Sequence, residues 1–328
     1  MVDLPSRTGP RVLVTGASGF VGRALCEHLE EHGFRVRRAL RRPPAGLAAE
    51  HVVVGEIGPH TDWDEALADV DLVAHLAARA HVMKETAVDP MAEYRSVNVE
   101  GTRRLAQAAA RHGVARLVFL SSVKVNGEAS ARVYTEDDEP HPEDRYGLSK
   151  WEAELALAEV GAKAGLEWCT IRPPLVYGPG VGANFLRLMQ SVARHRPLPL
   201  GAVRNLRSLV FVGNLVDAVR ACLTHPAAAN ATFLIRDGED LSSPILARRI
   251  ARALGVTPLL VPVPVPLLRL AGALTGRQAV IDRVVGSLRV DDRCLRQKLG
   301  WRAPFSVDEG LRDTAHWYLG LSRPPAVG

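Results

Sequence analysis

The chain has 328 residues, and its composition and charge exclude several classes of protein. Hydrophobic residues make up 47% of the chain and charged residues 23%, which is typical of globular proteins and excludes extensive disorder. The formal net charge is +5, but the arginines are scattered, with no long basic run and no aromatic platform among them, so nucleic-acid binding is not expected.

In the first half of the chain, short apolar and β-branched runs alternate with helical patterns. This alternation predicts an α/β fold, a doubly wound parallel sheet of the Rossmann type. The predicted strands span residues 11–15, 35–40, 51–54, 71–75, 116–120 and 167–171. The predicted helices lie near residues 20–32, 91–112 and 146–164.

Three glycines follow the first predicted strand in the sequence RVLVTGASGFVG. Gly16 permits a tight turn, Gly19 lets the backbone approach a phosphate, and Gly22 lets the helix pack close to the strand. The spacing therefore predicts a dinucleotide pyrophosphate at the helix N-terminus. The rest of the turn is expected to contact the same cofactor, through Ser18, Phe20 and Val21.

The second predicted strand ends without the acidic residue that would bind the adenosine ribose of NAD. Arg41 and Arg42 stand there and would suit the 2′-phosphate of NADP, unless they are solvated surface residues. We therefore expect NAD or NADP, with NADP mildly favoured. Glu56, after the third strand, is either an adenine contact or an ordinary loop carboxylate.

A tyrosine and a lysine begin the helical segment near residue 146. The i, i+4 spacing places Tyr146 and Lys150 on one face of the helix. The ammonium, together with the charge of an oxidised nicotinamide, would lower the pKa of Tyr146 toward neutrality, so that the phenol could exchange a proton with a substrate hydroxyl. Ser122, at the end of the fifth strand, could hydrogen-bond the reacting oxygen. A lone Tyr-x-x-x-Lys is usually a surface pair, but the order glycine turn, Ser-Ser, Tyr-x-x-x-Lys favours a catalytic set.

After Arg172 the alternation lapses into segments punctuated by proline and glycine. We expect a dinucleotide-binding domain over residues 1–172 and a smaller C-terminal α/β substrate lobe over 173–328. Residues 208–235 again show strand, helix and strand, and are expected to return to the first domain.

Residues 256–276 are apolar enough to resemble a membrane span. Arg269 interrupts the segment, and four prolines forbid a regular helix through it: Pro258, Pro262, Pro264 and Pro266. An extended stretch followed by a short amphipathic helix is predicted, with docking to a surface as the alternative; membrane insertion is not expected.

The cysteines and the first ten residues indicate a cytoplasmic protein. The N-terminal residues lack the apolar core of a signal peptide. The cysteines are far apart, match neither a disulfide framework nor a metal site, and are expected to be free thiols: Cys26, Cys169, Cys222 and Cys294.

Over nearly its whole length the chain resembles the extended short-chain dehydrogenase/reductase family, and within it the nucleotide-sugar epimerases and 4-ketoreductases. The resemblance is carried by TGASGFVG, HLAA, NVEGT, SSVKVNG, YGLSK, RPPLVYGPG and LGW. It implies the catalytic set Ser122, Tyr146 and Lys150, a structural role for Asn98, and a homodimer formed through helices 91–112 and 146–164. Further cofactor contacts are expected from Ile57, Leu76, Ala77, Ala78 and Pro173, besides Tyr146 and Lys150.

The resemblance also implies a UDP-sugar site in the second lobe. Arg207 precedes an apolar run, where its charge would need an ion pair or a diphosphate. Asn184 is either a uridine diphosphate contact or the cap of a helix starting at Phe185. Arg283 is a further phosphate candidate, and Lys124 and Ser122 are expected to contact the sugar. Three residues near the fourth strand either line the sugar pocket or belong to the core or a loop: His75, His81 and Met83.

Three functions remain open. The first is an epimerase that acts at C4 of a UDP-hexose or UDP-N-acetylhexosamine through a transient 4-keto sugar. The second is a 4-ketoreductase of a UDP-4-keto-6-deoxy-hexosamine, favoured by Arg41, Arg42 and Lys124. The third is a catalytically silent NAD(P)-binding redox sensor. Dehydration is disfavoured, because 4,6-dehydratases carry Asp-Glu where this chain has Val123 and Lys124.

Overall fold

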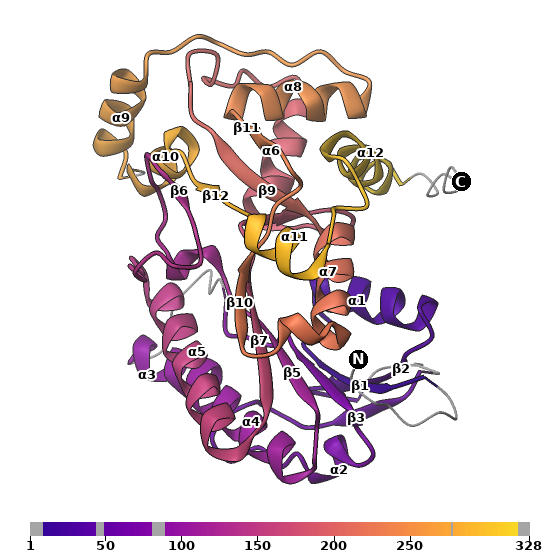
Figure 1. Cartoon of the computed structure of the whole chain (residues 1–328). Helices are drawn as coiled ribbons and strands as arrows, with labels where there is room; N and C mark the ends of the chain where they lie inside the picture. Colours follow the sequence, from indigo (N-terminus) through magenta and orange to yellow (C-terminus); the bar gives the residue numbers. More distant parts are fainter. Residues whose placement is uncertain (1–8, 44–48, 81–88, 277, 321–328) are drawn as a thin grey trace.

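The computed structural model describes residues 9–43, 49–80, 89–276 and 278–320. Figure 1 shows a large sheet flanked by helices and, at the other end of the molecule, a smaller lobe built mostly from the second half of the chain. Within the described residues, no helix is both long and apolar enough to cross a membrane.

The large sheet is entirely parallel and has the strand order β10-β7-β5-β4-β1-β2-β3. The doubly wound prediction is therefore confirmed, and the six predicted strands are observed to within one residue at each end. The strands are β1 (Arg11–Thr15), β2 (Arg35–Leu40), β3 (His51–Val53), β4 (Leu72–His75), β5 (Arg116–Leu120), β7 (Glu167–Arg172) and β10 (Ala231–Leu234).

Helices cover both faces of this sheet because its strands are apolar on both sides. In β1, Val12 and Val14 pack in the core beneath α1 and α7, whereas Leu13 faces the core beneath α2, α4 and α5. The predicted helix 91–112 is divided by a π-helical segment, η1 (Arg95–Glu100). The other helices are α1 (Phe20–Glu31), α2 (Asp64–Leu67), α3 (Pro90–Tyr94), α4 (Gly101–Arg111), α5 (Arg145–Ala164) and α7 (Val212–Thr224).

The second lobe contains two small sheets. One has the order β11-β9-β8, and the other pairs β6 with β12, so a strand from the first half of the chain joins one from the end. Their strands are β6 (Val133–Tyr134), β8 (Leu175–Tyr177), β9 (Arg207–Phe211), β11 (Asp240–Leu241) and β12 (Arg289–Val290). The helices of this lobe are α6 (Ala183–Ala193), α8 (Ser243–Leu254), α9 (Val265–Leu274), α10 (Gln278–Val285), α11 (Arg293–Leu299) and α12 (Val307–Tyr318). Two short 3₁₀ turns adjoin strands of the large sheet: η2 (Val123–Val125) follows β5, and η3 (Pro226–Ala228) precedes β10.

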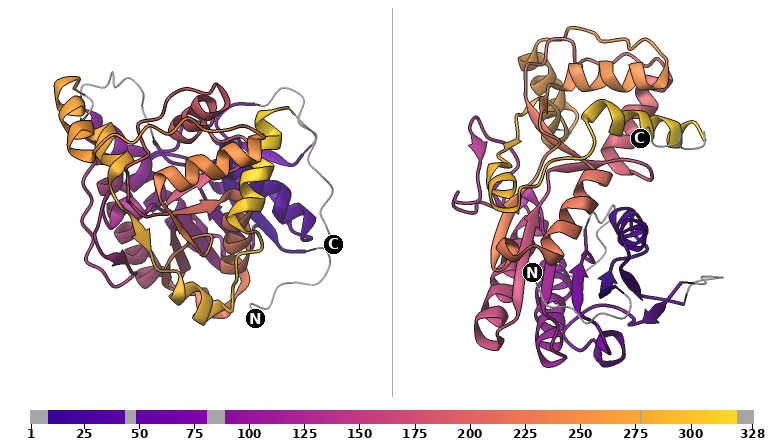
Figure 2. Two further views of the ribbon diagram at one scale, coloured as in Figure 1. Left: turned by 90° about the horizontal axis from the view of Figure 1, so that it is seen from above. Right: turned by 45° about the vertical axis from the view of Figure 1, so that its right-hand side comes forward.

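The segment 208–235 is shared between the two sheets. Its helix α7 packs beside α1 on the large sheet, and β10 forms the edge of that sheet, but β9 belongs to the small sheet. The right-hand view of Figure 2 shows this segment passing between the lobes.

Residues 256–276 form an irregular stretch followed by the helix α9, as predicted, but α9 is not amphipathic. Leu268 and Gly272 are buried, yet the opposite face is also apolar and exposes Leu267, Leu270 and Leu274. Because almost every residue of α9 is apolar, the sequence did not indicate which face of the helix would be buried.

Candidate active site

The glycine turn has the geometry that a pyrophosphate cradle requires. Gly16 has a φ of +68°, and a Cβ there would lie 2.8 Å from the backbone nitrogen of Ala77. A Cβ on Gly22 would lie 2.1 Å from the carbonyl oxygen of Gly16. Gly19 is the N-cap of α1, no side chain caps the helix, and its first turn carries no acidic residue. The turn therefore fits a dinucleotide diphosphate, with Ser18 exposed and with Phe20 and Val21 half-buried beside it.

A buried hydrogen-bond network holds the loop after β4 against this turn. The Thr15 hydroxyl accepts bonds from the backbone nitrogens of Leu76 and Ala77, each at 3.1 Å. It therefore donates to Nδ1 of His75 at 2.7 Å, while Nε2 of His75 donates to Thr102 at 3.0 Å. Ala78 follows in the same half-buried loop.

His75 is a core residue and does not line a sugar pocket. It is fully buried, both ring nitrogens are bonded, and its ring stacks on Phe119. Burial, with a smaller effect of Lys150, lowers the pKa of His75 to about 3, so the imidazole is neutral. His81 and Met83 lie outside the described residues.

The two serines after β5 have different surroundings. Ser121 is buried and donates to Glu154 of α5. Glu154 in turn pairs with Arg172 at the end of β7, with 2.6 Å between Nη2 and Oε2, in the buried interior. This ion pair was missed by sequence reasoning. Ser122 is half-buried at the N-cap of η2, where its Oγ accepts a bond from the Lys124 nitrogen at 3.2 Å.

Tyr146 and Lys150 lie in the first turns of α5, at the end of the large sheet where Ser122 follows β5. Lys150 is 1% exposed, and its Nζ lies 3.8 Å from the centroid of the Phe119 ring on β5. Burial lowers the pKa of Lys150 to about 7, although Glu154 opposes the shift. A close approach makes Gly147 necessary between them: a Cβ there would lie 2.7 Å from the carbonyl oxygen of Lys124.

The expected lowering of the Tyr146 pKa does not come from this chain's own side chains. Burial, followed by Asp144 and Tyr94, raises the pKa of Tyr146 well above its usual value. The reason is that a phenolate at the half-buried Tyr146 loses solvation and lies near the negative charge of Asp144. Spacing to Lys150 alone did not reveal either influence.

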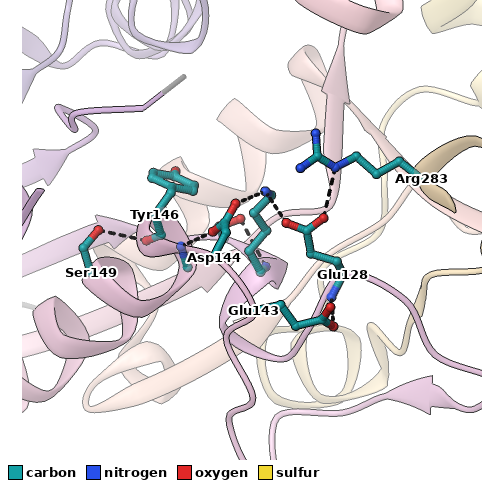
Figure 3. Close-up of polar contacts among 9 residues, drawn as sticks. Glu128, Glu143, Asp144, Tyr146, Ser149 and Arg283 are labelled. Atoms are coloured by element: carbon teal, nitrogen blue, oxygen red, sulfur yellow. Dashed lines mark hydrogen bonds and ion pairs between the residues drawn. The ribbon is translucent and has the colours of Figure 1, made fainter. Parts of the chain in front are cut away.

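Asn98 connects the β4 loop to the start of α5, consistent with a structural role. Its amide exchanges two hydrogen bonds with the backbone of Arg79, at 2.7 and 3.0 Å, and donates to Ser149 at 2.9 Å. Ser149 donates to the carbonyl oxygen of Tyr146 at 2.8 Å, as Figure 3 shows.

A row of alternating charges runs from α5 to the second lobe, and Figure 3 shows Asp144, Glu128 and Arg283 along it. Asp144 is the N-cap of α5 and accepts a bond from the Gly147 nitrogen at 2.7 Å. The Lys124 ammonium bonds Asp144 and, at 2.6 Å, Glu128. Glu128 also pairs with Nε of Arg283 at 3.1 Å. Glu128 and Asp144 were not anticipated from the sequence.

Arg207 joins this group from β9. Its guanidinium donates to the carbonyl oxygens of Arg283 and Gly286, at 2.8 and 3.0 Å, where α10 ends. These carbonyls, at the C-terminal end of a helix, partly accommodate its charge, and the predicted diphosphate contact of Arg207 stays a prediction. Burial lowers the pKa of Arg207, while nearby Glu128 opposes the shift.

Asn184 is exposed in the first turn of α6. The predicted capping role is wrong, because the helix starts at Ala183 and Gly182 is its N-cap.

The remaining cofactor candidates lie around the same edge. Nη1 of Arg41 is 3.3 Å from Oε1 of Glu56, and both side chains are mostly exposed, so two predicted contacts of opposite charge face each other. Arg42 is exposed. Ile57 packs against Gly101, where a Cβ would lie 2.7 Å away, and the Pro173 carbonyl accepts a bond from the Val123 nitrogen at 3.0 Å.

Comparison with known proteins identifies similar sequences over nearly the whole chain. The model of the "NAD dependent epimerase/dehydratase family" matches residues 12–235. A UDP-glucose 4-epimerase of Vibrio cholerae is 42% identical over 315 residues, which cover 94% of this chain and 95% of that protein. The N-acetyl-alpha-D-glucosaminyl-diphospho-ditrans,octacis-undecaprenol 4-epimerase of Escherichia coli O157:H7 is 31% identical over 326 residues, covering 93% and 94%.

Among solved structures, MoeE5 in complex with UDP-glucose and NAD superimposes with a TM-score of 0.76 at 28% identity. The superposition covers 94% of this chain and 99% of MoeE5.

Proposed function

The chain belongs to the NAD dependent epimerase/dehydratase family, and on this premise we propose that it inverts C4 of a UDP-hexose or UDP-N-acetylhexosamine through a transient 4-keto sugar. It is an NAD-dependent enzyme of the extended short-chain dehydrogenase/reductase type. The observation that carries the proposal is the placement of Tyr146 and Lys150 in the first turns of α5 and of Ser122 directly after β5, at the end of the large sheet where the glycine turn follows β1. The names of the Vibrio cholerae relative and of the MoeE5 complex support a UDP-sugar substrate.

In this proposal Tyr146 exchanges the proton of the C4 hydroxyl, and Ser122 hydrogen-bonds the same oxygen. When bound, NAD supplies the acceptor for the C4 hydride and a positive charge beside the phenol. That charge would oppose burial and Asp144, which raise the pKa of Tyr146. Lys150 adds a second cation when protonated, and Lys124 neutralises Asp144.

The substrate diphosphate is assigned to the cations around Glu128. Lys124 and Arg283 both form ion pairs with Glu128. Arg207 lies close enough to Glu128 for that negative charge to favour the protonated guanidinium, against the effect of burial. An incoming diphosphate would offer these cations stronger acceptors than one carboxylate does. Asn184 and His81 are also proposed as substrate contacts. The boundary between the dinucleotide-binding domain and the substrate lobe is proposed at residue 172.

We assign the cofactor contacts to the glycine turn and to the loops after β2, β3 and β4, with Pro173 near Ser122. The preference for NADP remains a prediction, and the pairing of Arg41 with Glu56 weakens it. A homodimer through α4 and α5 is also proposed. Two ion pairs join η1 and α4 to α5, Arg95 with Glu152 and Arg103 with Glu159, each at 2.6 Å, beside the half-exposed Leu155.

Product analysis tests the proposal. Purified protein is incubated with UDP-glucose or UDP-N-acetylglucosamine, and the nucleotide sugars are resolved; the C4 epimer is expected. Absence of an epimer, together with NADPH consumption on a 4-keto UDP-sugar, would identify the 4-ketoreductase instead. Dinucleotide binding without turnover of any of these sugars would identify the redox sensor.

A further inference from the structure

Exposed apolar side chains gather on one helix of the second lobe. In the described part of the chain, six of the exposed large hydrophobic residues lie within residues 259–280. On α9, Leu267, Leu270 and Leu274 are 55%, 56% and 79% exposed, and Val280 of the neighbouring helix α10 is 52% exposed. Spacing of i, i+3 and i+7 places the three leucines on one face of α9.

The opposite face of α9 already has its partner. Leu268 is buried, and Gly272 lies so close to α10 that a Cβ there would be 2.9 Å from Ile281. The exposed leucines therefore face away from the protein, on a helix whose single charged side chain, Arg269, pairs with Asp282 of α10 at 3.3 Å. A helix that is apolar on all sides normally has apolar surroundings on all sides.

The charge of the same part of the chain is strongly one-sided. Residues 243–285 contain six arginines and one acidic residue, Asp282, which gives a formal net charge of +5. Three of the arginines pair with carboxylates: Arg249 with Glu239 and Asp308, Arg269 with Asp282, and Arg283 with Glu128. Arg248 and Arg252 are exposed on α8, which lies with α9 at the outer end of the second lobe (Figure 1). The arginines are Arg248, Arg249, Arg252, Arg269, Arg277 and Arg283.

We propose that the leucine face of α9, with Val280 and the basic surface of α8, docks on the surface of an anionic phospholipid bilayer. Leucines that enter the headgroup boundary beside arginines that meet anionic lipids are the combination by which helices bind in the plane of a membrane. A spanning segment is not involved, because α9 has only 10 residues. The left-hand view of Figure 2 shows α9 projecting from the body of the molecule at the upper left.

Docking would bring the α10 end of the protein to the membrane. Arg283 of α10 pairs with Glu128, so the proposed diphosphate site would face the same side as the bilayer. The helices α4 and α5 lie at the other end of the molecule (Figure 1), so a dimer formed through them would leave α9 uncovered.

Vesicle flotation tests this inference independently of catalysis. Full-length protein is mixed with phosphatidylcholine vesicles with or without phosphatidylglycerol, and the floated fraction is measured at low and high salt. We expect binding to the anionic vesicles, and at least about tenfold weaker partitioning of the combined variant Leu267→Gln, Leu270→Gln, Leu274→Gln. Arg248→Gln with Arg252→Gln should also weaken binding, by about tenfold, and reduce its salt dependence.

Leu319→Gln is the matched control, because Leu319 is 49% exposed but lies beyond α12, away from α9. This variant should bind anionic vesicles as the unaltered protein does. Thermal unfolding checks that each variant is folded. Failure of the unaltered protein to float with anionic vesicles, or undiminished binding by the leucine variant, would overturn the inference. So would a leucine variant that dissociates an oligomer of the unaltered protein in size-exclusion chromatography, because a second copy would then cover α9.

Discussion

Charged groups lie both at the carboxyl ends of the strands of the large sheet and beside α10 in the second lobe. The first set is buried, and the second is partly exposed. At the carboxyl ends of the strands, Glu154 and Arg172 are almost completely buried, and Lys150 lies over the Phe119 ring. On the α10 side, Arg283 is 47% exposed and its pairing with Glu128 faces water. Buried pairs fail at high cost when one partner is lost, whereas exposed pairs contribute little and rearrange easily. The difference suits a fixed site for proton and hydride transfer beside an adjustable site for substrate recognition.

The largest effect is expected at the fixed site, from Tyr146→Phe. Loss of the phenol hydroxyl should reduce kcat by about 10²- to 10⁴-fold. In the proposed mechanism Tyr146 is the group that exchanges the proton of the C4 hydroxyl. Dinucleotide binding, measured by fluorescence titration, should be unchanged. Substantial epimerase activity in this variant would overturn the assigned acid and base.

Breaking the buried pair should come next. Glu154→Ala leaves the Arg172 guanidinium buried without its carboxylate and should cost about 3–5 kcal/mol of unfolding free energy in urea denaturation. The double variant Glu154→Leu, Arg172→Met is the control and should recover much of that loss. Equal destabilisation by the single and double variants would show that the charge is not the cause.

The pH dependence of stability tests the burial of Lys150. Its pKa is lowered by burial from 10.5 to about 7 in the folded protein, so between these values the unfolded chain binds more protons. The stability contributed by this group therefore rises with pH, by at most about 1.4 kcal/mol per pH unit, and this rise should vanish in Lys150→Met. Urea denaturation at several pH values above neutrality measures the slope. Identical slopes for both proteins would contradict a buried lysine.

The smallest effect is expected on the adjustable side. Glu128→Gln removes the carboxylate that holds Lys124 and Arg283, so KM for the UDP-sugar should fall by about two- to fivefold while kcat changes little. Glu159→Gln, in the exposed pair with Arg103 on the α5 side, is the control and should leave KM unchanged. A higher KM for Glu128→Gln would show that this carboxylate supports substrate binding.

The sequence predicted best those features that are encoded locally. The apolar runs of the parallel strands and the spacing of Gly16, Gly19 and Gly22 state a backbone geometry directly, and the structure has it. Asn184 shows the limit: capping of the helix was one of its two predicted roles, but the helix begins earlier, with Gly182 as its N-cap.

Features that depend on distant partners were not predictable in this way. Glu128 and Arg283 are 155 residues apart, and only the fold brings them together. Glu154 and Arg172 meet because α5 returns to β7. The raised pKa of Tyr146 likewise depends on burial and on the position of Asp144, which the Tyr-x-x-x-Lys spacing does not contain.

In the proposed epimerase reaction, one hydride leaves C4 and returns to the same carbon within a single site. UDP-glucose deuterated at C4 tests it, with the product and the dinucleotide examined by mass spectrometry and NMR. We expect the C4 epimer to keep the deuterium at C4, with no labelled dinucleotide released. Deuterium found in released reduced dinucleotide, or lost from C4 to water, would contradict it.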